Sequence, residues 1–202
     1  MPKQPTKAPQ KKAEKPTQKN QVRIIAGSLK RRSLPLVNAE GIRPTPDRVR
    51  ETVFNWLMGD LQGTRVLDVC AGSGAFGIEC ISRGAKEAIL IEPFSAQAAL
   101  LKDSLEKFGI SHQVTLYQKP AQSVLPTLTG VFDVVFIDPP YALNLWETLM
   151  DALSPKLHEN SLIYLEGDKP LEALLATPEN FLVIKSGKFG QIYGYLLRPH
   201  TA

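Results

Sequence analysis

The sequence has few of the residues that build disulfides, metal sites or membrane spans. Its 202 residues include two cysteines, Cys70 and Cys80, and three histidines that do not follow the spacing of a ligand set. The cysteines fall in one apolar region, where a reduced thiol behaves as a small buried hydrophobe. No apolar run reaches the roughly 18 residues that cross a bilayer, and the amino terminus lacks an apolar signal segment. We therefore expect a cytoplasmic protein without a disulfide, a metal site or a membrane anchor.

Negative charge is scarce near the amino terminus. Residues 1–50 contain thirteen Lys and Arg but three Asp and Glu, whereas residues 51–202 contain eleven and seventeen. A basic end on an acidic body favours a polyanionic partner, most simply a nucleic acid, and a solubilising tail is the alternative. Residues 1–20 hold six Lys and four Pro with almost nothing apolar, which predicts a disordered basic tail.

The rest of the chain alternates between strand and helix patterns. Residues 21–40 predict an amino-terminal β-hairpin extension, and residues 41–202 predict the main domain. In that domain, strand patterns at 65–69, 87–91, 113–117, 131–137 and 160–166 alternate with helix patterns at 75–83, 95–108, 121–127, 143–153 and 170–176. Such alternation predicts a doubly wound, mostly parallel α/β sheet. Two further strands, at 180–186 and 191–198, complete seven and predict an antiparallel hairpin at the sheet edge.

Glycines follow the first strand of the main domain. Residues 68–77 (DVCAGSGAFG) leave that strand and open a helix, and glycine there lets the backbone approach a ligand closely. Glu92 follows the second strand, where an acid can accept both hydroxyls of a ribose. Asp68 suits an ammonium group and repels a pyrophosphate, which argues against a dinucleotide such as NAD. A tight strand-to-helix turn without a ligand is the alternative.

The fourth strand ends in an acid, two prolines and a tyrosine. Residues 132–143 (FDVVFIDPPYAL) read as a buried strand followed by Asp138, Pro139, Pro140 and Tyr141. Ligands of open α/β sheets lie outside the carboxyl ends of the strands, so this motif should meet the glycine loop and Glu92 at one rim. A capped turn that happens to contain proline is the alternative.

These motifs resemble the class I S-adenosylmethionine-dependent methyltransferases, and DPPY resembles the subgroup that methylates exocyclic or amide nitrogens. Residues 22–27 (VRIIAG) and 41–57 (GIRPTPDRVRETVFNWL) resemble more specifically the RsmD-type 16S ribosomal RNA guanine-N2 methyltransferases. The resemblance covers residues 22–198 and makes residues 41–202 a Rossmann-like methyltransferase domain. It implies that a monomer transfers the methyl group of S-adenosylmethionine to the N2 amine of a guanine in 16S rRNA. The substrate would be the 30S subunit or its assembly intermediate.

The resemblance also implies roles for individual residues. The Asp138 carboxylate and the Pro139 carbonyl would accept the hydrogens of the target amine, and Tyr141 would stack on the base. The residues expected at the cofactor are Asp68, Ala71, Gly72, Gly74, Glu92, Phe94, Ala121 and Thr45, with Glu92 on the ribose and Phe94 beside the adenine. Those expected at the RNA are Arg43, Lys30, Arg31, Arg32 and Pro140. Pro120 stands where many relatives have Asn or Asp, so backbone or another side chain would read the adenine amine.

Three other functions fit parts of this pattern. A DNA adenine-N6 methyltransferase also uses DPPY, but 202 residues leave little room for a DNA-reading domain. A protein glutamine methyltransferase usually has Asn where Asp138 stands. A non-catalytic RNA-binding ribosome assembly factor could use the same scaffold, and measurable turnover would separate it from an enzyme.

Deletion of residues 1–20 should leave the fold and cofactor binding intact, because nothing in this segment can join a hydrophobic core. RNA affinity should fall and become less dependent on salt, since each lost phosphate contact lowers the log–log slope by about 0.7–0.9. Filter binding at several salt concentrations measures the slope for both proteins. An unchanged slope would reduce the segment to a spacer.

Overall fold

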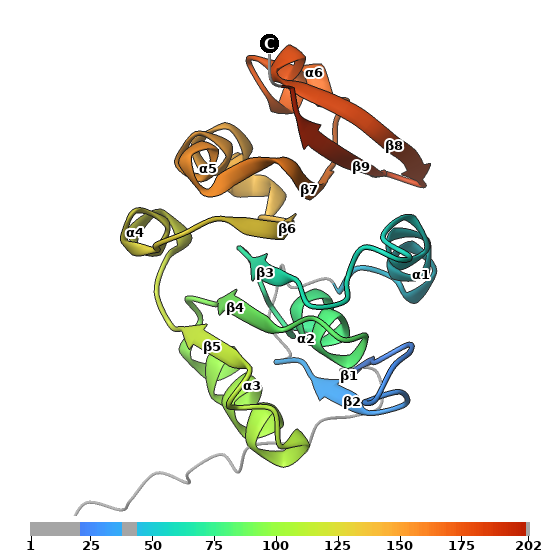
Figure 1. Ribbon diagram of the computed structural model, residues 1–202, viewed down its shortest axis with the longest axis vertical. Coiled ribbons are helices and arrows are strands. Elements are labelled where there is room, and N and C mark those ends of the chain that lie inside the picture. Colours follow the sequence, from blue (N-terminus) through green and yellow to red (C-terminus); the bar gives the residue numbers. More distant parts are fainter. Residues whose placement is uncertain (1–20, 38–43, 201–202) are drawn as a thin grey trace, which may run out of the picture.

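The computed structural model describes residues 21–37 and 44–200, and its centre is a seven-stranded sheet (Figure 1). The strand order is β5-β4-β3-β6-β7-β9-β8. All neighbours pair in parallel except that β9 runs antiparallel to both β7 and β8. The strands are β3 (Arg65–Asp68), β4 (Glu87–Ile91), β5 (Val114–Tyr117), β6 (Phe132–Ile137), β7 (Leu157–Gly167), β8 (Phe181–Phe189) and β9 (Ile192–Pro199). The predicted mostly parallel sheet with an antiparallel hairpin at its edge is confirmed.

Helices cover both faces of the sheet. One core lies under α1 (Asp47–Trp56), α2 (Ala75–Ser82) and α3 (Ser95–Phe108), and the other lies under α4 (Ala121–Val124), α5 (Trp146–Leu153) and α6 (Leu171–Leu174). Strand β6 serves both cores, because Val134 and Phe136 face the first and Val135 and Ile137 face the second. A continuous apolar run is what a strand covered on both faces requires. None of the helices in the described ranges is long and apolar enough to span a bilayer.

Several predicted boundaries are wrong, for local reasons. Residues 121–127 form α4 and then the 3-10 turn η2 (Leu125–Thr127), because Pro126 has no amide hydrogen to continue an α-helix. The helix predicted at 143–153 begins only at Trp146, after the 3-10 turn η3 (Tyr141–Leu143) and Asn144, whose φ of 48° is left-handed. Strand β8 continues to Phe189, so the terminal turn is shorter than predicted. The short 3-10 turns η4 (Ser154–Lys156) and η5 (Pro178–Asn180) precede β7 and β8.

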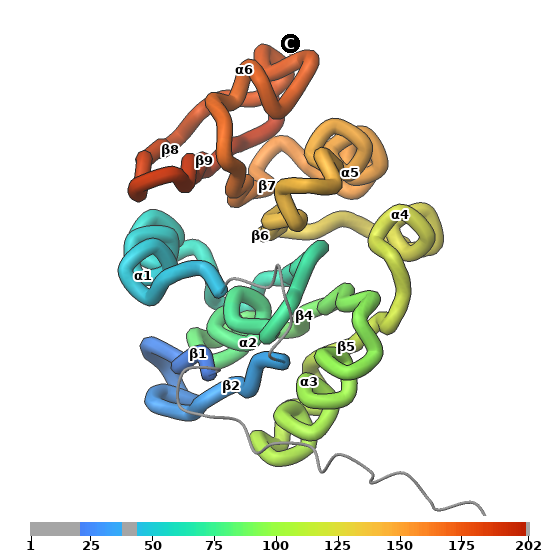
Figure 2. Tube along the Cα trace, turned by 180° about the vertical axis from the view of Figure 1, so that it is seen from behind, coloured from blue at the N-terminus to red at the C-terminus, as the bar shows by residue number. Residues whose placement is uncertain are grey.

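The amino-terminal hairpin forms as predicted and packs into the first core. Strands β1 (Gln21–Arg23) and β2 (Ser33–Pro35) pair antiparallel as a separate small sheet. Figure 2 shows this hairpin beside α2 and α3. Its apolar side chains are buried in the core shared with α1, α2 and α3, and they are Val22, Ile24, Leu29, Leu34 and Leu36. The hairpin is therefore attached to the main domain by a common hydrophobic core.

The loop of the hairpin is fixed to α2 by buried polar contacts. The fully buried carboxylate of Glu79 accepts the backbone N–H groups of Ile25 at 2.6 Å and Ala26 at 2.9 Å, and it pairs with Arg83 at 2.8 Å. Gly27 has a φ of +78°, and a Cβ there would lie 1.8 Å from the carbonyl oxygen of Ser82. The close approach of loop and helix therefore depends on this glycine.

Replacing Glu79 with Ala should lower the free energy of unfolding by about 2–4 kcal/mol, because two partly buried amides and a guanidinium lose a fully buried acceptor. Urea denaturation measures the change. The matched control is Glu87→Ala, which breaks a half-exposed pair with Arg65 and should cost about 1 kcal/mol or less. Equal losses in both variants would contradict a special role for the buried carboxylate.

Candidate active site

Four carboxylates meet at the carboxyl ends of four neighbouring strands. Asp68 ends β3, Glu92 follows β4, Asp138 follows β6 and Glu166 lies one residue before the end of β7. Because these strands are adjacent and parallel in the order β4-β3-β6-β7, their acids share one rim. None of the four pairs with a basic side chain in the described part of the chain. The described residues also contain no group of three or more His, Cys, Asp or Glu that could hold a metal ion.

The glycine loop and Glu92 form the first half of the rim. The backbone N–H of Gly72 donates to one Glu92 oxygen at 2.9 Å, and the N–H of Phe94 donates to the other at 2.7 Å. Gly72 has a φ of +51°, and a Cβ there would project into open space. Burial raises the pKa of Glu92, and these two amides oppose the rise. Each carboxylate oxygen can accept a further hydrogen bond, so the pair fits the two hydroxyls of a ribose.

Asp68 lies beneath this loop and is almost fully buried. The N–H of Gly77 donates to its carboxylate at 3.1 Å. Burial raises the pKa of Asp68 to about 7, and the negative charge of Glu92 adds to the rise. A cationic group nearby would favour the ionised form of this acid. The site therefore offers two acidic side chains and a glycine loop that faces open space. These groups fit a positively charged nucleoside such as S-adenosylmethionine.

The predicted catalytic acid has an unexpected partner. The hydroxyl of Thr45, just before α1, donates to a carboxylate oxygen of Asp138 at 3.1 Å. We expected Thr45 at the cofactor; its hydroxyl does not cap α1 either, because Pro46 occupies the cap position and no side chain caps the helix. Burial raises the pKa of Asp138 well above its usual range, and the charge of Glu166 raises it further. A contact between Thr45 and the cofactor stays a prediction.

Tyr141 is anchored to an acid that the sequence pattern did not single out. Its phenol donates to Glu166 at 3.1 Å, and its ring packs on Trp146 with centroids 5.8 Å apart. Tyr164 donates to the other Glu166 oxygen at 2.8 Å. The signal available in the sequence is a glutamate at the end of the apolar run of β7. Because Glu166 is an ionisable residue at the end of a buried strand, on the predicted rim, this signal is sufficient to predict it as a site residue.

The other predicted cofactor and motif residues lie along the same rim. Ala71 and Gly74 belong to the loop between β3 and α2, and the left-handed Gly74 immediately precedes the helix. Ala121 is buried at the first position of α4. Phe94, whose N–H donates to Glu92, is 43% exposed, and its contact with an adenine stays a prediction. Pro139 is buried and Pro140 is exposed.

The predicted basic triplet lies elsewhere. Lys30, Arg31 and Arg32 are exposed in the hairpin loop, which packs on the carboxyl-terminal end of α2 through the N–H of Ser28 and the carbonyl of Ser82 at 2.8 Å. The glycine loop lies at the opposite end of this helix, roughly 12 Å away for eight residues. The triplet is therefore not brought together with DPPY, and its contact with RNA stays a prediction. Arg43 lies outside the described residues.

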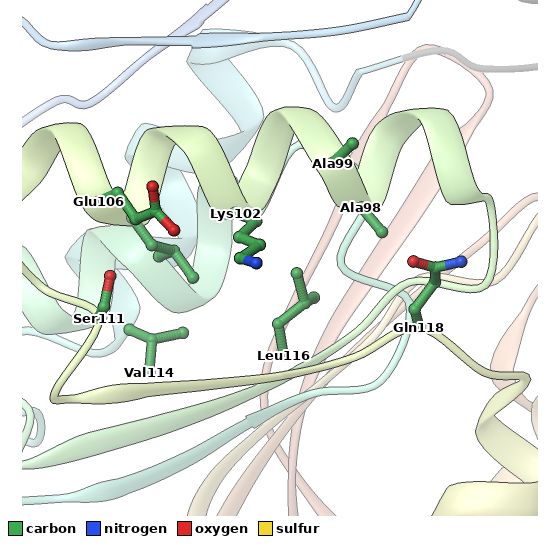
Figure 3. Close-up of a pocket in the computed structure, with 9 residues that line it drawn as sticks. Ala98, Ala99, Lys102, Glu106, Ser111, Val114, Leu116 and Gln118 are labelled. Atoms are coloured by element: carbon green, nitrogen blue, oxygen red, sulfur yellow. The ribbon is translucent and has the colours of Figure 1, made fainter.

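A separate cleft of about 500 Å³ runs between α3 and the edge strand β5 (Figure 3). Apolar side chains of β5, Val114 and Leu116, lie along its floor, and Lys102 and Glu106 project from α3. None of the predicted cofactor, catalytic or RNA-binding residues lines it. The acidic rim is therefore the site that carries the predicted chemistry.

Comparison with known proteins identifies the family. Residues 22–198 match the model of the family described as Conserved hypothetical protein 95. The chain is 41% identical to ribosomal RNA small subunit methyltransferase D of Haemophilus influenzae, covering 89% of this chain and 95% of that protein. The protein of the same name from Escherichia coli strain K12 is 36% identical, covering 85% and 87%.

Solved structures agree with these matches. The methyltransferase yhhF from Escherichia coli has a TM-score of 0.78 at 34% identity, covering 90% of this chain and 99% of that chain. The methylase HI0767 from Haemophilus influenzae has a TM-score of 0.74 at 36% identity, covering 89% and 98%. The predicted fold and methyltransferase class are confirmed, and with them S-adenosylmethionine as the methyl donor. The chain belongs to the family of the ribosomal RNA small subunit methyltransferase D proteins.

Proposed function

We propose that this protein transfers a methyl group from S-adenosylmethionine to the exocyclic N2 amine of a guanine in 16S rRNA. The observation that carries the proposal is the Asp138 carboxylate at the tip of β6, followed by two prolines and the anchored Tyr141. The names of the relatives, which refer to the ribosomal RNA of the small subunit, support an rRNA substrate. The 30S subunit or its assembly intermediate is the proposed partner, and a monomer acting in the cytoplasm is the proposed state.

The target amine is a poor nucleophile because its lone pair is delocalised into the guanine ring. Two acceptors aimed at its hydrogens pull the nitrogen toward tetrahedral geometry and free that lone pair. The Asp138 carboxylate would be one acceptor, held by the Thr45 hydroxyl at 3.1 Å. The carbonyl of Pro139 would be the other, kept in place by the rigid Pro-Pro backbone.

Proton release follows methylation, because a nitrogen that gains a methyl group must lose a hydrogen to become neutral again. Asp138 would accept this proton, and a carboxyl whose pKa is raised by burial has the proton affinity for that role. Tyr141 would stack on the base, a contact worth roughly 1–3 kcal/mol. The guanine must leave its stack to reach this pocket, which costs least in an accessible loop.

The cofactor would lie across the ends of β3 and β4. Glu92 would bind the ribose hydroxyls, Asp68 the ammonium group, and the ring of Phe94 would flank the adenine. The backbone at Gly72 would border the methionine portion. When bound here, S-adenosylmethionine supplies an electrophilic methyl group, and the rim orients it toward the amine held at Asp138.

Residues away from the cofactor half of the rim would hold the RNA. We propose residues 1–20 as a basic tail, residues 21–40 as an extension and residues 41–202 as the methyltransferase domain. Lys30, Arg31 and Arg32 lie at the far end of α2, so they would contact phosphates away from the target base rather than the base itself. Arg43 and Pro140 are proposed closer to the flipped nucleotide.

Labelled S-adenosylmethionine incubated with naked 16S rRNA, 30S subunits and duplex DNA tests the product. We expect N2-methylguanosine, with 30S or partly assembled particles modified faster than naked rRNA, because a small domain reads little sequence by itself. Nucleoside analysis identifies the methylated base. N6-methyladenine, or faster methylation of duplex DNA, would favour the DNA methyltransferase instead, and absence of turnover on every substrate would favour an assembly factor.

The Asp138→Ala variant should lose at least about tenfold in turnover, or about 1.4 kcal/mol of transition-state stabilisation. Its affinity for S-adenosylmethionine should stay within a few-fold, because the carboxylate faces the substrate amine. Asp151→Ala, at an exposed position of α5, is the control and should behave as wild type. Retention of more than a tenth of the wild-type turnover would remove Asp138 from the catalytic role.

The Glu92→Ala variant should bind S-adenosylmethionine about 1.5–3 kcal/mol more weakly, the usual range for hydrogen bonds to a charged group. Titration calorimetry measures the affinity, and thermal unfolding checks that the glycine loop is intact without its acceptor. Glu106→Ala, an exposed acid on α3, serves as the control. Unchanged affinity in the Glu92 variant would mean that this residue does not bind the ribose.

A further inference from the structure

Glu166 is a buried carboxylate whose hydrogen-bond partners, among residues 21–37 and 44–200, are all neutral. Its side chain is 2% exposed and accepts the hydroxyls of Tyr164 at 2.8 Å and Tyr141 at 3.1 Å. Its backbone carbonyl accepts the indole N–H of Trp146 at 2.7 Å. A buried carboxylate without a cation is costly, and an apolar or amide side chain would fill a purely structural position at lower cost. The burial of Glu166 beside the DPPY motif therefore indicates a functional role in the site.

The contacts of Glu166 lead directly to the DPPY motif. The phenol of Tyr141 is held at one end by Glu166, and its ring is held by Trp146, whose indole also reaches the Glu166 backbone. A ring that stacks on an extruded base must already be oriented when the base arrives. Glu166 thus determines the orientation of the aromatic wall of the proposed base pocket.

Glu166 also lies beside the catalytic acid. Strands β6 and β7 are neighbours, with Ile137 opposite Leu165, so the acids that follow these positions are adjacent. The hydroxyl of Thr45 donates to Asp138 at 3.1 Å and also lies next to Glu166. Two carboxylates in a low-dielectric site disfavour each other's ionisation.

Each element packed around Asp138 contributes a group to its environment. Asp68 and the thiol of Cys70 come from β3 and the following loop, Glu166 and Tyr164 from β7, Tyr141 from η3, and the neutral hydroxyl of Thr45 from the start of α1. Within the described residues, no Lys, Arg or His forms an ion pair with Asp138. Among the neighbouring charges, that of Glu166 raises the pKa of Asp138 most, after burial itself.

We propose that Glu166 is a positioning residue for methyl transfer, which orients Tyr141 and places a second carboxylate beside Asp138 so that Asp138 takes the proton released by the amine. This inference rests on the proposed function. In the step concerned, the nitrogen forms its bond to the methyl carbon and the sulfur keeps the electron pair of the broken S–C bond. One N–H bond then breaks, its electron pair stays on nitrogen, and the proton goes to an oxygen of Asp138.

The test compares the pH dependence of kcat/KM for wild type and Glu166→Gln on 30S subunits. The amide keeps the size of the side chain and removes its charge, so the pKa of Asp138 should fall. Because Asp138 must be ionised to accept a proton, the acid limb of the profile should move to lower pH. We also expect kcat to fall roughly tenfold, which is less than the 10²–10⁴-fold contribution of a group that itself transfers the proton. Affinity for S-adenosylmethionine should stay within a few-fold.

Two other variants keep the inference falsifiable if Glu166→Gln does not fold. Thr45→Val removes a hydrogen bond that lowers the pKa of Asp138, so the acid limb should move to higher pH, opposite to the shift of Glu166→Gln. Tyr141→Phe keeps the charge of Glu166 and should lower kcat without moving the limb to lower pH. Glu159→Gln, an exposed acid at the other end of β7, is the matched control and should change nothing.

An acid limb that stays in place in a folded, cofactor-binding Glu166→Gln variant overturns the inference, even if kcat falls. A limb that moves to lower pH supports it. The product made by the wild-type protein tests the proposed function separately, because the pH comparison can be made on whichever base the wild type methylates. A failure of the inference about Glu166 can therefore be distinguished from a failure of the proposed function.

Discussion

Repulsion among four carboxylates at one rim of the sheet is the constraint on which the rest of the site depends. Asp68, Glu92, Asp138 and Glu166 are brought together by strand order, and within the described residues each is stabilised only by neutral donors. Backbone amides hold Asp68 and Glu92, a threonine hydroxyl holds Asp138, and two phenols hold Glu166. Such donors offset part of the desolvation cost and leave the negative potential uncancelled. The rim therefore favours a ligand that brings its own positive charge.

The same constraint divides the rim into two halves. The acids of β3 and β4 stand at the glycine loop, where a nucleoside can approach the backbone, whereas the acids of β6 and β7 stand with Thr45 and Tyr141. Strands β3 and β6 are neighbours. A methyl donor bound at β3 and β4 would therefore meet a target base bound at β6 and β7 between Asp68 and Asp138. The amino-terminal segment contributes to this arrangement, since Thr45 reaches the rim only because α1 packs on the core shared with the hairpin.

Much of this arrangement could be predicted from the sequence, because local patterns carry it. The apolar runs of β3, β4 and β6 and the motifs that follow them predicted the sheet and the convergence of Asp68, Glu92 and Asp138. Contacts between distant segments could not be predicted. Thr45 meets Asp138 across 93 residues of sequence, and the basic triplet is directed to the far end of α2 by the buried Glu79. Glu166 follows the apolar run 162–165 of β7, and its hydrogen bonds to Tyr141 and Tyr164 identify it as part of the site.

The number of protons exchanged when S-adenosylmethionine binds tests the acidic-rim account most directly. Calorimetry in buffers of different ionisation enthalpy gives this number, at about pH 6.5, where an α-amino group with a pKa of about 7.7–8.0 is already protonated. The pKa of Asp68 in the free protein is raised to about 7 by burial, so most of this acid carries a proton at that pH. A cationic ligand should ionise it, and we expect net proton release that is smaller in Asp68→Asn. Binding without proton release, or with proton uptake, would contradict a rim that binds the cofactor through its positive charge.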